Sequence, residues 1–150
     1  MYDFLKHAHS GLRWLVLIFI VVSIVNALMK RGKNTEYSKA DKMPVLLGLI
    51  FTHVQLVIGL ILYFISQKFS FANGMGALMK DAVGRFYAVE HISLMILAVV
   101  LITVGYSKSK RQELASKKHT TVLIFYGIAL LLILVSIPWP FRTELGGTWF

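Results

Sequence analysis

Four long apolar runs constrain the fold of this chain more than any other feature. They occupy residues 12–29, 44–66, 85–106 and 120–139. A helix rises about 1.5 Å per residue, so about 20 residues cross a hydrocarbon core of about 30 Å. The runs are too long and too evenly apolar for the strands of a membrane barrel, which leaves helices as the structure that satisfies their backbone in lipid.

We therefore expect an all-α membrane protein whose four transmembrane helices form an up-down bundle. The expected spans are about residues 10–29, 44–66, 84–106 and 119–138 of a single domain covering residues 1–150. The apolar stretch of the first span is longer than that of a cleavable signal, and no small-residue cleavage site follows it, so we expect it to remain as the first helix.

The composition agrees with this class of protein. Hydrophobic residues make up 57% of the chain and charged residues 15%, whereas soluble domains are about 45–50% apolar and about a quarter charged. The mean hydropathy is +0.69. With no cysteine in the chain, disulfides, thiolate-bound metals and a cysteine nucleophile are excluded, so histidine or a carboxylate must carry any chemistry.

The basic residues predict the orientation. Ten of the sixteen Lys and Arg residues lie in residues 30–42 and 107–118, between the first and second runs and between the third and fourth. Because cytoplasmic loops carry the excess of Lys and Arg, we expect these loops inside and both termini outside. Topology then explains the net charge of +9, and no nucleic-acid partner is needed.

Polar residues inside the spans are the functional candidates, because ionisable groups are costly in a membrane. Small residues share the face of His91 at helical spacing, and a polar-to-small face of the first span carries His9 and Arg13. We expect these two faces to meet in the core. On the second span, a small-polar stripe runs beside His53 and includes Gly59, which leaves room for a flat, bulky cofactor.

Depth along the helices favours His53 and His91 as a pair. His53 lies within about 3 Å of the middle of its span, and His91 about 6–7 Å toward the outside. His9 lies roughly 15 Å above the middle of its helix, which suits haem propionates or the surface better than a ligand position. We expect His7 at the surface, with a metal site shared with His9 as the alternative.

Three interpretations of the core histidines remain open. Two imidazoles on adjacent helices can ligate one haem iron, with cations such as Arg13 or Arg85 on the propionates. Alternatively, the histidines only form hydrogen bonds between helices. A proton path through Glu90, His91 and His53 is the third interpretation.

Two further polar residues have simpler expected roles. Arg13 and Glu90 should lie at similar depths in the outer half of the membrane, which predicts an ion pair between helices. His119 follows two lysines at the cytoplasmic edge and is expected to be solvated.

Several segments resemble a known family. They are residues 9–14 (HSGLRW), 51–64 (FTHVQLVIGLILYF), 85–91 (RFYAVEH) and 137–142 (IPWPFR). Together they resemble the small four-span bacterial membrane proteins usually labelled cytochrome b, and the second segment is also similar in style to helices of haem A synthase. The resemblance implies haem b at His53 and His91 and a multi-pass protein of the bacterial inner (cytoplasmic) membrane.

The resemblance adds no reaction. For the whole protein we expect one haem b in the bundle and electron exchange with quinol or a larger respiratory complex. A single haem near the outer side does not carry electrons across the bilayer, so a partner or a quinone is needed. The alternatives are a haem-free structural or accessory subunit and a proton-conducting bundle that uses Glu90 and the core histidines.

Overall fold

The computed structural model describes residues 1–33, 35–65 and 68–149. Its long helices are α1 (Tyr2–Lys30), α2 (Lys39–Phe64), α5 (His91–Arg111) and α6 (Ala115–Ser136). The short elements are α3 (Met75–Lys80), α4 (Ala82–Arg85), a π-helix (Phe86–Glu90) and a 3-10 helix (Thr143–Leu145). The described residues contain no strand. The expected all-α class is therefore confirmed.

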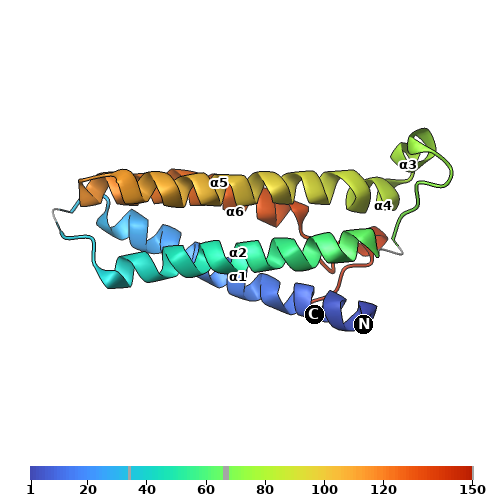
Figure 1. Cartoon of the computed structure of the whole chain (residues 1–150), viewed down its shortest axis with the longest axis horizontal. Coiled ribbons are helices and arrows are strands. Elements are labelled where there is room, and N and C mark those ends of the chain that lie inside the picture. Colours follow the sequence, from blue (N-terminus) through green and yellow to red (C-terminus); the bar gives the residue numbers. More distant parts are fainter. Residues whose placement is uncertain (34, 66–67, 150) are drawn as a thin grey trace.

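Four helical segments are long and apolar enough to cross a membrane, as a multi-pass membrane protein requires. They are α1, α2, α6 and the continuous helix formed by α4, the π-helix and α5. These segments lie side by side as a bundle, and the two ends of the chain lie at the same end of it (Figure 1). Each helix packs against its neighbours along the chain, and α1 also packs against α6, so the bundle is closed.

Small residues allow the helices to approach closely in the core. Ala27, Ala98 and Ala129 are at most 1% exposed, on three different helices. A side chain at Gly105 would place its Cβ 2.4 Å from the Cβ of Phe125, so α5 and α6 approach as closely as they do because this residue is glycine. Small residues at helix interfaces are typical of membrane bundles, where van der Waals contact replaces the hydrophobic drive between helices.

The helices extend beyond the apolar runs. α1 begins at Tyr2 rather than near residue 10, because no helix-breaking residue interrupts the polar first turns. α5 continues to Arg111, and the cations of its last turn interact favourably with the helix dipole. α6 ends at Ser136, close to the expected end, since proline at position 138 disfavours helical backbone at Ile137. Ser66, the expected end of the second span, lies outside the described residues.

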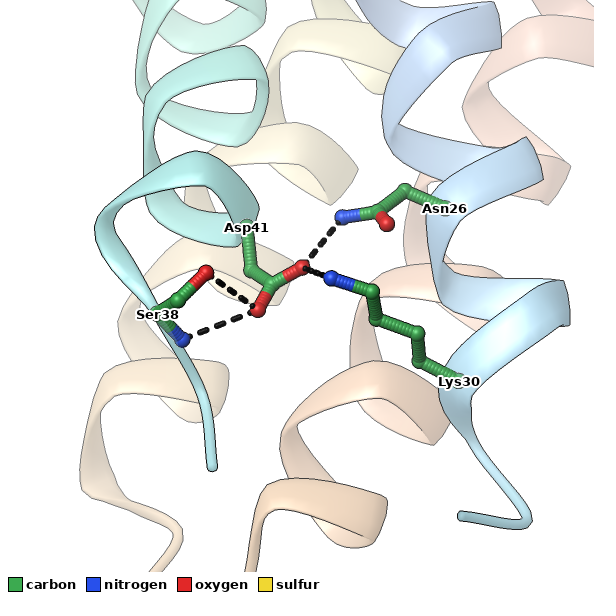
Figure 2. Close-up of polar contacts among 4 residues, drawn as sticks. All are labelled: Asn26, Lys30, Ser38 and Asp41. Atoms are coloured by element: carbon green, nitrogen blue, oxygen red, sulfur yellow. Dashed lines mark hydrogen bonds and ion pairs between the residues drawn. The ribbon is translucent and has the colours of Figure 1, made fainter. Parts of the chain in front are cut away.

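A buried carboxylate joins the ends of α1 and α2 (Figure 2). The side chain of Asp41 accepts hydrogen bonds from Asn26 (2.7 Å), from Lys30 (2.6 Å) and from the backbone and hydroxyl of Ser38 (2.8 and 2.9 Å). The contacts with Ser38 form a capping box at the start of α2. This cluster therefore fixes how the chain leaves one helix and enters the next.

His119 lies in the core at the same end of the bundle, so the prediction that it is solvated is wrong. It is 2% exposed, and its ring packs edge-on against that of Tyr37 with the ring centres 4.9 Å apart. Tyr37, between α1 and α2, covers the histidine. Burial raises the pKa of the Tyr37 hydroxyl above its ordinary value.

Candidate functional site

A cavity of about 200 Å³ lies inside the bundle, toward the end where both chain ends lie. All four spans and the segment after α6 form its walls. Its inner part is apolar and includes Val16, Ala98 and Ile133. Its polar lining includes the two histidines discussed next.

His9 of α1 and His91 of α5 face each other across this cavity. Their ring centres are 6.4 Å apart and the rings are inclined by 68°. The expected meeting of the two helix faces is therefore confirmed. His9 is closer to His91 than the sequence indicated because α1 begins eight residues earlier than expected, which moves the middle of the helix toward its N-terminus.

A hydrogen bond to α6 orients the ring of His91, and a π-helix precedes this residue in the chain. Its Nδ1 lies 2.7 Å from the carbonyl oxygen of Ser136, in the last turn of α6, so Nδ1 carries the proton and donates it. The lone pair of a neutral ring is then on Nε2, which bonds to no described residue. The π-helix Phe86–Glu90 ends immediately before His91. Such single π turns inside α-helices are frequent at functional sites.

His9 is held by α2. Gln55 donates a hydrogen bond from Nε2 to the backbone carbonyl of His9 at 2.8 Å. The imidazole packs on Gly59, where a Cβ would come within 3.0 Å of the ring Cε1. The stripe of small and polar residues predicted on the second span therefore makes room for a histidine of the first.

Three buried polar atoms at this cavity have no hydrogen-bond partner among the described residues. They are Nδ1 of His9, Nε of Arg13 and Oε1 of Gln55. Buried polar groups are almost always paired, and each unpaired one costs about 1–3 kcal/mol. These three atoms are therefore available to bond to a ligand or to ordered water in the cavity.

All charged residues of the described cavity lining are basic. They are Lys6, Arg13 and Lys68. An apolar interior with cations near the end of the bundle suits a ligand that has an apolar body and anionic groups.

His53 lies in another part of the bundle. Its Nδ1 donates to the carbonyl oxygen of Leu49 at 2.8 Å, and its Nε2 lies 3.3 Å from the hydroxyl oxygen of Thr103. Thr103 follows His91 by twelve residues, about 18 Å along a helix. The structure therefore does not bring His53 and His91 together, and His53 does not line the cavity.

The predicted ion pair between Arg13 and Glu90 is wrong. Glu90 instead pairs with Arg85, five residues earlier on the same continuous helix, at 2.7 Å. Arg13 donates from Nη2 to the carbonyl oxygens of Thr148 and Trp149 at 3.2 and 2.8 Å. Arg13 therefore has backbone partners in the segment after α6. The path of this segment has no periodic signal in the sequence, so these partners could not be predicted.

The other candidates lie outside the cavity. Arg85 is engaged by Glu90 and by the carbonyl oxygen of Met79, and it does not line the cavity. His7 is exposed, as expected. Among the described residues, no group of three or more His, Asp or Glu side chains could hold a metal ion. A metal at His9 and His91 would therefore need further ligands from a cofactor.

Comparisons of the chain with models of protein families, with curated proteins and with solved structures found no match.

Proposed function

We propose that this chain binds one haem b in the cavity, with His9 and His91 as the two axial ligands, and transfers electrons in the membrane. The pairing of these two rings across a cavity whose inner part is apolar carries the proposal. It keeps the expectation of two core histidines and replaces His53 by His9.

The spacing of the rings supports this assignment. Two imidazoles that ligate one metal ion from opposite sides at about 2 Å place their ring centres about 6–6.5 Å apart. The observed distance is 6.4 Å. The proton of His91 on Nδ1 faces a backbone carbonyl, which is how metal-binding histidines are usually oriented while the other nitrogen binds the metal.

The residues of the cavity fit the remaining parts of a haem. Apolar side chains would exclude water from the ring, Gly59 removes a side chain beside His9, and Arg13 has an unpaired Nε for a propionate. The volume of about 200 Å³ is below the range of about 300–1,000 Å³ usual for small-molecule sites. A porphyrin therefore requires the cavity to widen.

A haem iron with two imidazole ligands supplies single-electron transfer. In this proposal the protein lies in the bacterial cytoplasmic membrane with both termini outside, as the basic loops favour. The cavity is then nearer the outer side. A quinol or a respiratory complex on that side would exchange electrons with it.

A visible spectrum of the purified protein, oxidised and dithionite-reduced, tests the proposal. We expect a Soret band in the purified protein or after haem reconstitution, and low-spin features that His9→Ala and His91→Ala each abolish. The matched control is His53→Ala, which removes a histidine of the core outside the cavity and should leave the low-spin spectrum intact.

Two outcomes would contradict the proposal. Absence of a Soret band after reconstitution would favour a haem-free structural subunit. A low-spin spectrum lost in His53→Ala and kept in His9→Ala would return the ligand assignment to the pair expected from the sequence.

A further inference from the structure

The segment that follows α6 returns over the end of the cavity. We call residues 138–149 the strap. Pro138, Gly146, Gly147 and Thr148 all line the cavity, although none belongs to a spanning helix. The strap thus forms part of the cavity wall. It lies at the end of the bundle where both chain ends lie (Figure 1).

Side chains of the helices hold the strap by its backbone. Tyr87 donates from its hydroxyl to the carbonyl oxygen of Leu145 at 2.7 Å. Trp14 donates from Nε1 to the carbonyl oxygen of Trp149 at 3.1 Å, and Arg13 bonds to the same carbonyl. The side chain of Leu145 adds one apolar anchor and is 3% exposed.

The strap is compact but has little regular structure. Its 3-10 helix has three residues and ends at Gly146, whose φ of 60° favours glycine. The next residue, Gly147, packs on the carbonyl of Pro138 so closely that a Cβ would be 1.7 Å from the oxygen. Hydrogen bonds and the contacts of Trp139 and Trp149 with Trp14 also anchor the strap, but only one side chain of its described residues is buried. Because it buries much less apolar surface than the helices beneath it, the strap opens at lower free energy.

Arg13 both bonds to the strap and lines the cavity, as Tyr87 also does. Arg13 uses Nη2 for the strap, while its Nε is buried, unpaired and beside the cavity. An anionic group bound at Nε would hold the guanidinium in the position in which Nη2 fastens the strap. Ligand binding and strap closure then favour each other by the same factor.

We propose that the strap is a gate, which opens to admit an amphipathic anionic ligand and closes over it through Arg13, Trp14 and Tyr87. The proposal rests on the cavity used in the proposed function. It does not require that the ligand is haem. It also explains how a cavity of about 200 Å³ can receive a larger molecule.

Cysteine labelling tests the gate and does not require haem. The chain contains no cysteine, so the label reacts only with a thiol that is introduced. Thr52→Cys places a thiol in the cavity wall, and Ser109→Cys places one elsewhere in the core. The two native residues are similarly buried, at 4% and 3% exposed. Labelling rates with a water-soluble methanethiosulfonate are measured in detergent, with the native strap and with the strap loosened by Trp14→Phe and Tyr87→Phe together.

Loss of two hydrogen bonds to the strap should speed labelling at Thr52→Cys by about tenfold and leave Ser109→Cys unchanged. A second variant, Leu145→Ala, should act in the same direction. An unchanged rate at Thr52→Cys in both variants would place the entrance between the helices and overturn the gate. Equal acceleration at both thiols would show general loosening and overturn it as well. If the protein shows no haem spectrum but the labelling results are as expected, the proposed function fails and the gate stands.

Discussion

A single backbone carbonyl determines what His91 can do. By accepting the proton of Nδ1, Ser136 assigns the tautomer and directs Nε2 away from α6. On the facing helix, Gly59 sets the position of His9 by having no side chain. The two rings are thus placed by a carbonyl and a missing methyl group, and neither is placed by a charged partner.

The close contact between Gly59 and His9 predicts the effect of adding one methyl group at position 59. Gly59→Ala would press on the ring of His9 at 3.0 Å, and we expect haem affinity to fall by about tenfold or more. Haem titration followed at the Soret band measures the change.

Gly127→Ala is the control, since a Cβ at this helical glycine meets nothing within 4 Å. This variant should keep the native affinity and stabilise α6 by up to about 1 kcal/mol. Equal affinities of the two variants would remove Gly59 from the site.

At the scale of the elements, the helices and their inward faces could be predicted from the sequence, whereas the composition of the site could not. The faces of His9 and His91 follow from spacings of three and four residues, which the structure confirms. Helix ends in the polar interface have no such signal, and the eight extra residues of α1 changed which histidine lies opposite His91. A π turn and an irregular strap also have no periodicity to detect.

The buried carboxylate of Asp41, where α1 ends and α2 begins, predicts how much this junction contributes to the free energy of unfolding. Asp41→Ala removes the partner of Lys30 and the capping box with Ser38. We expect a loss of about 2–3 kcal/mol, less than the roughly 3–5 kcal/mol for a fully buried pair, because the Lys30 side chain stays 31% exposed.

Reversible unfolding in detergent with sodium dodecyl sulfate measures this loss. Asp3→Ala, which removes an exposed carboxylate in the first turn of α1, is the control and should change stability by less than about 0.5 kcal/mol. A similar stability of both variants would mean that the cluster contributes nothing to the bundle.

At the scale of the whole molecule, the two connections rich in Lys and Arg lie at one end of the bundle, and both chain ends and the cavity lie at the other (Figure 1). The structure therefore distinguishes the two ends of the bundle, and the positive-inside rule predicts that the end with the basic connections faces the cytoplasm. The histidine pair would then be nearer to the outer surface.

Labelling of intact cells tests this direction. Ser70→Cys and Ser107→Cys each introduce one exposed thiol, at opposite ends of the bundle. A membrane-impermeant maleimide should label Ser70→Cys in intact cells and Ser107→Cys only after permeabilisation. The reverse pattern would place the basic connections outside and the cavity on the cytoplasmic side.

The position of the strap in the chain also orders the events of biosynthesis. Translation proceeds from the N-terminus, so α1, α2, α5 and α6 all leave the ribosome before residues 138–149. The helices that line the cavity are therefore synthesised before the strap. Arg13 and Trp14 are thus synthesised well before the backbone carbonyls that they bind, and these bonds form only after all four spans have been made.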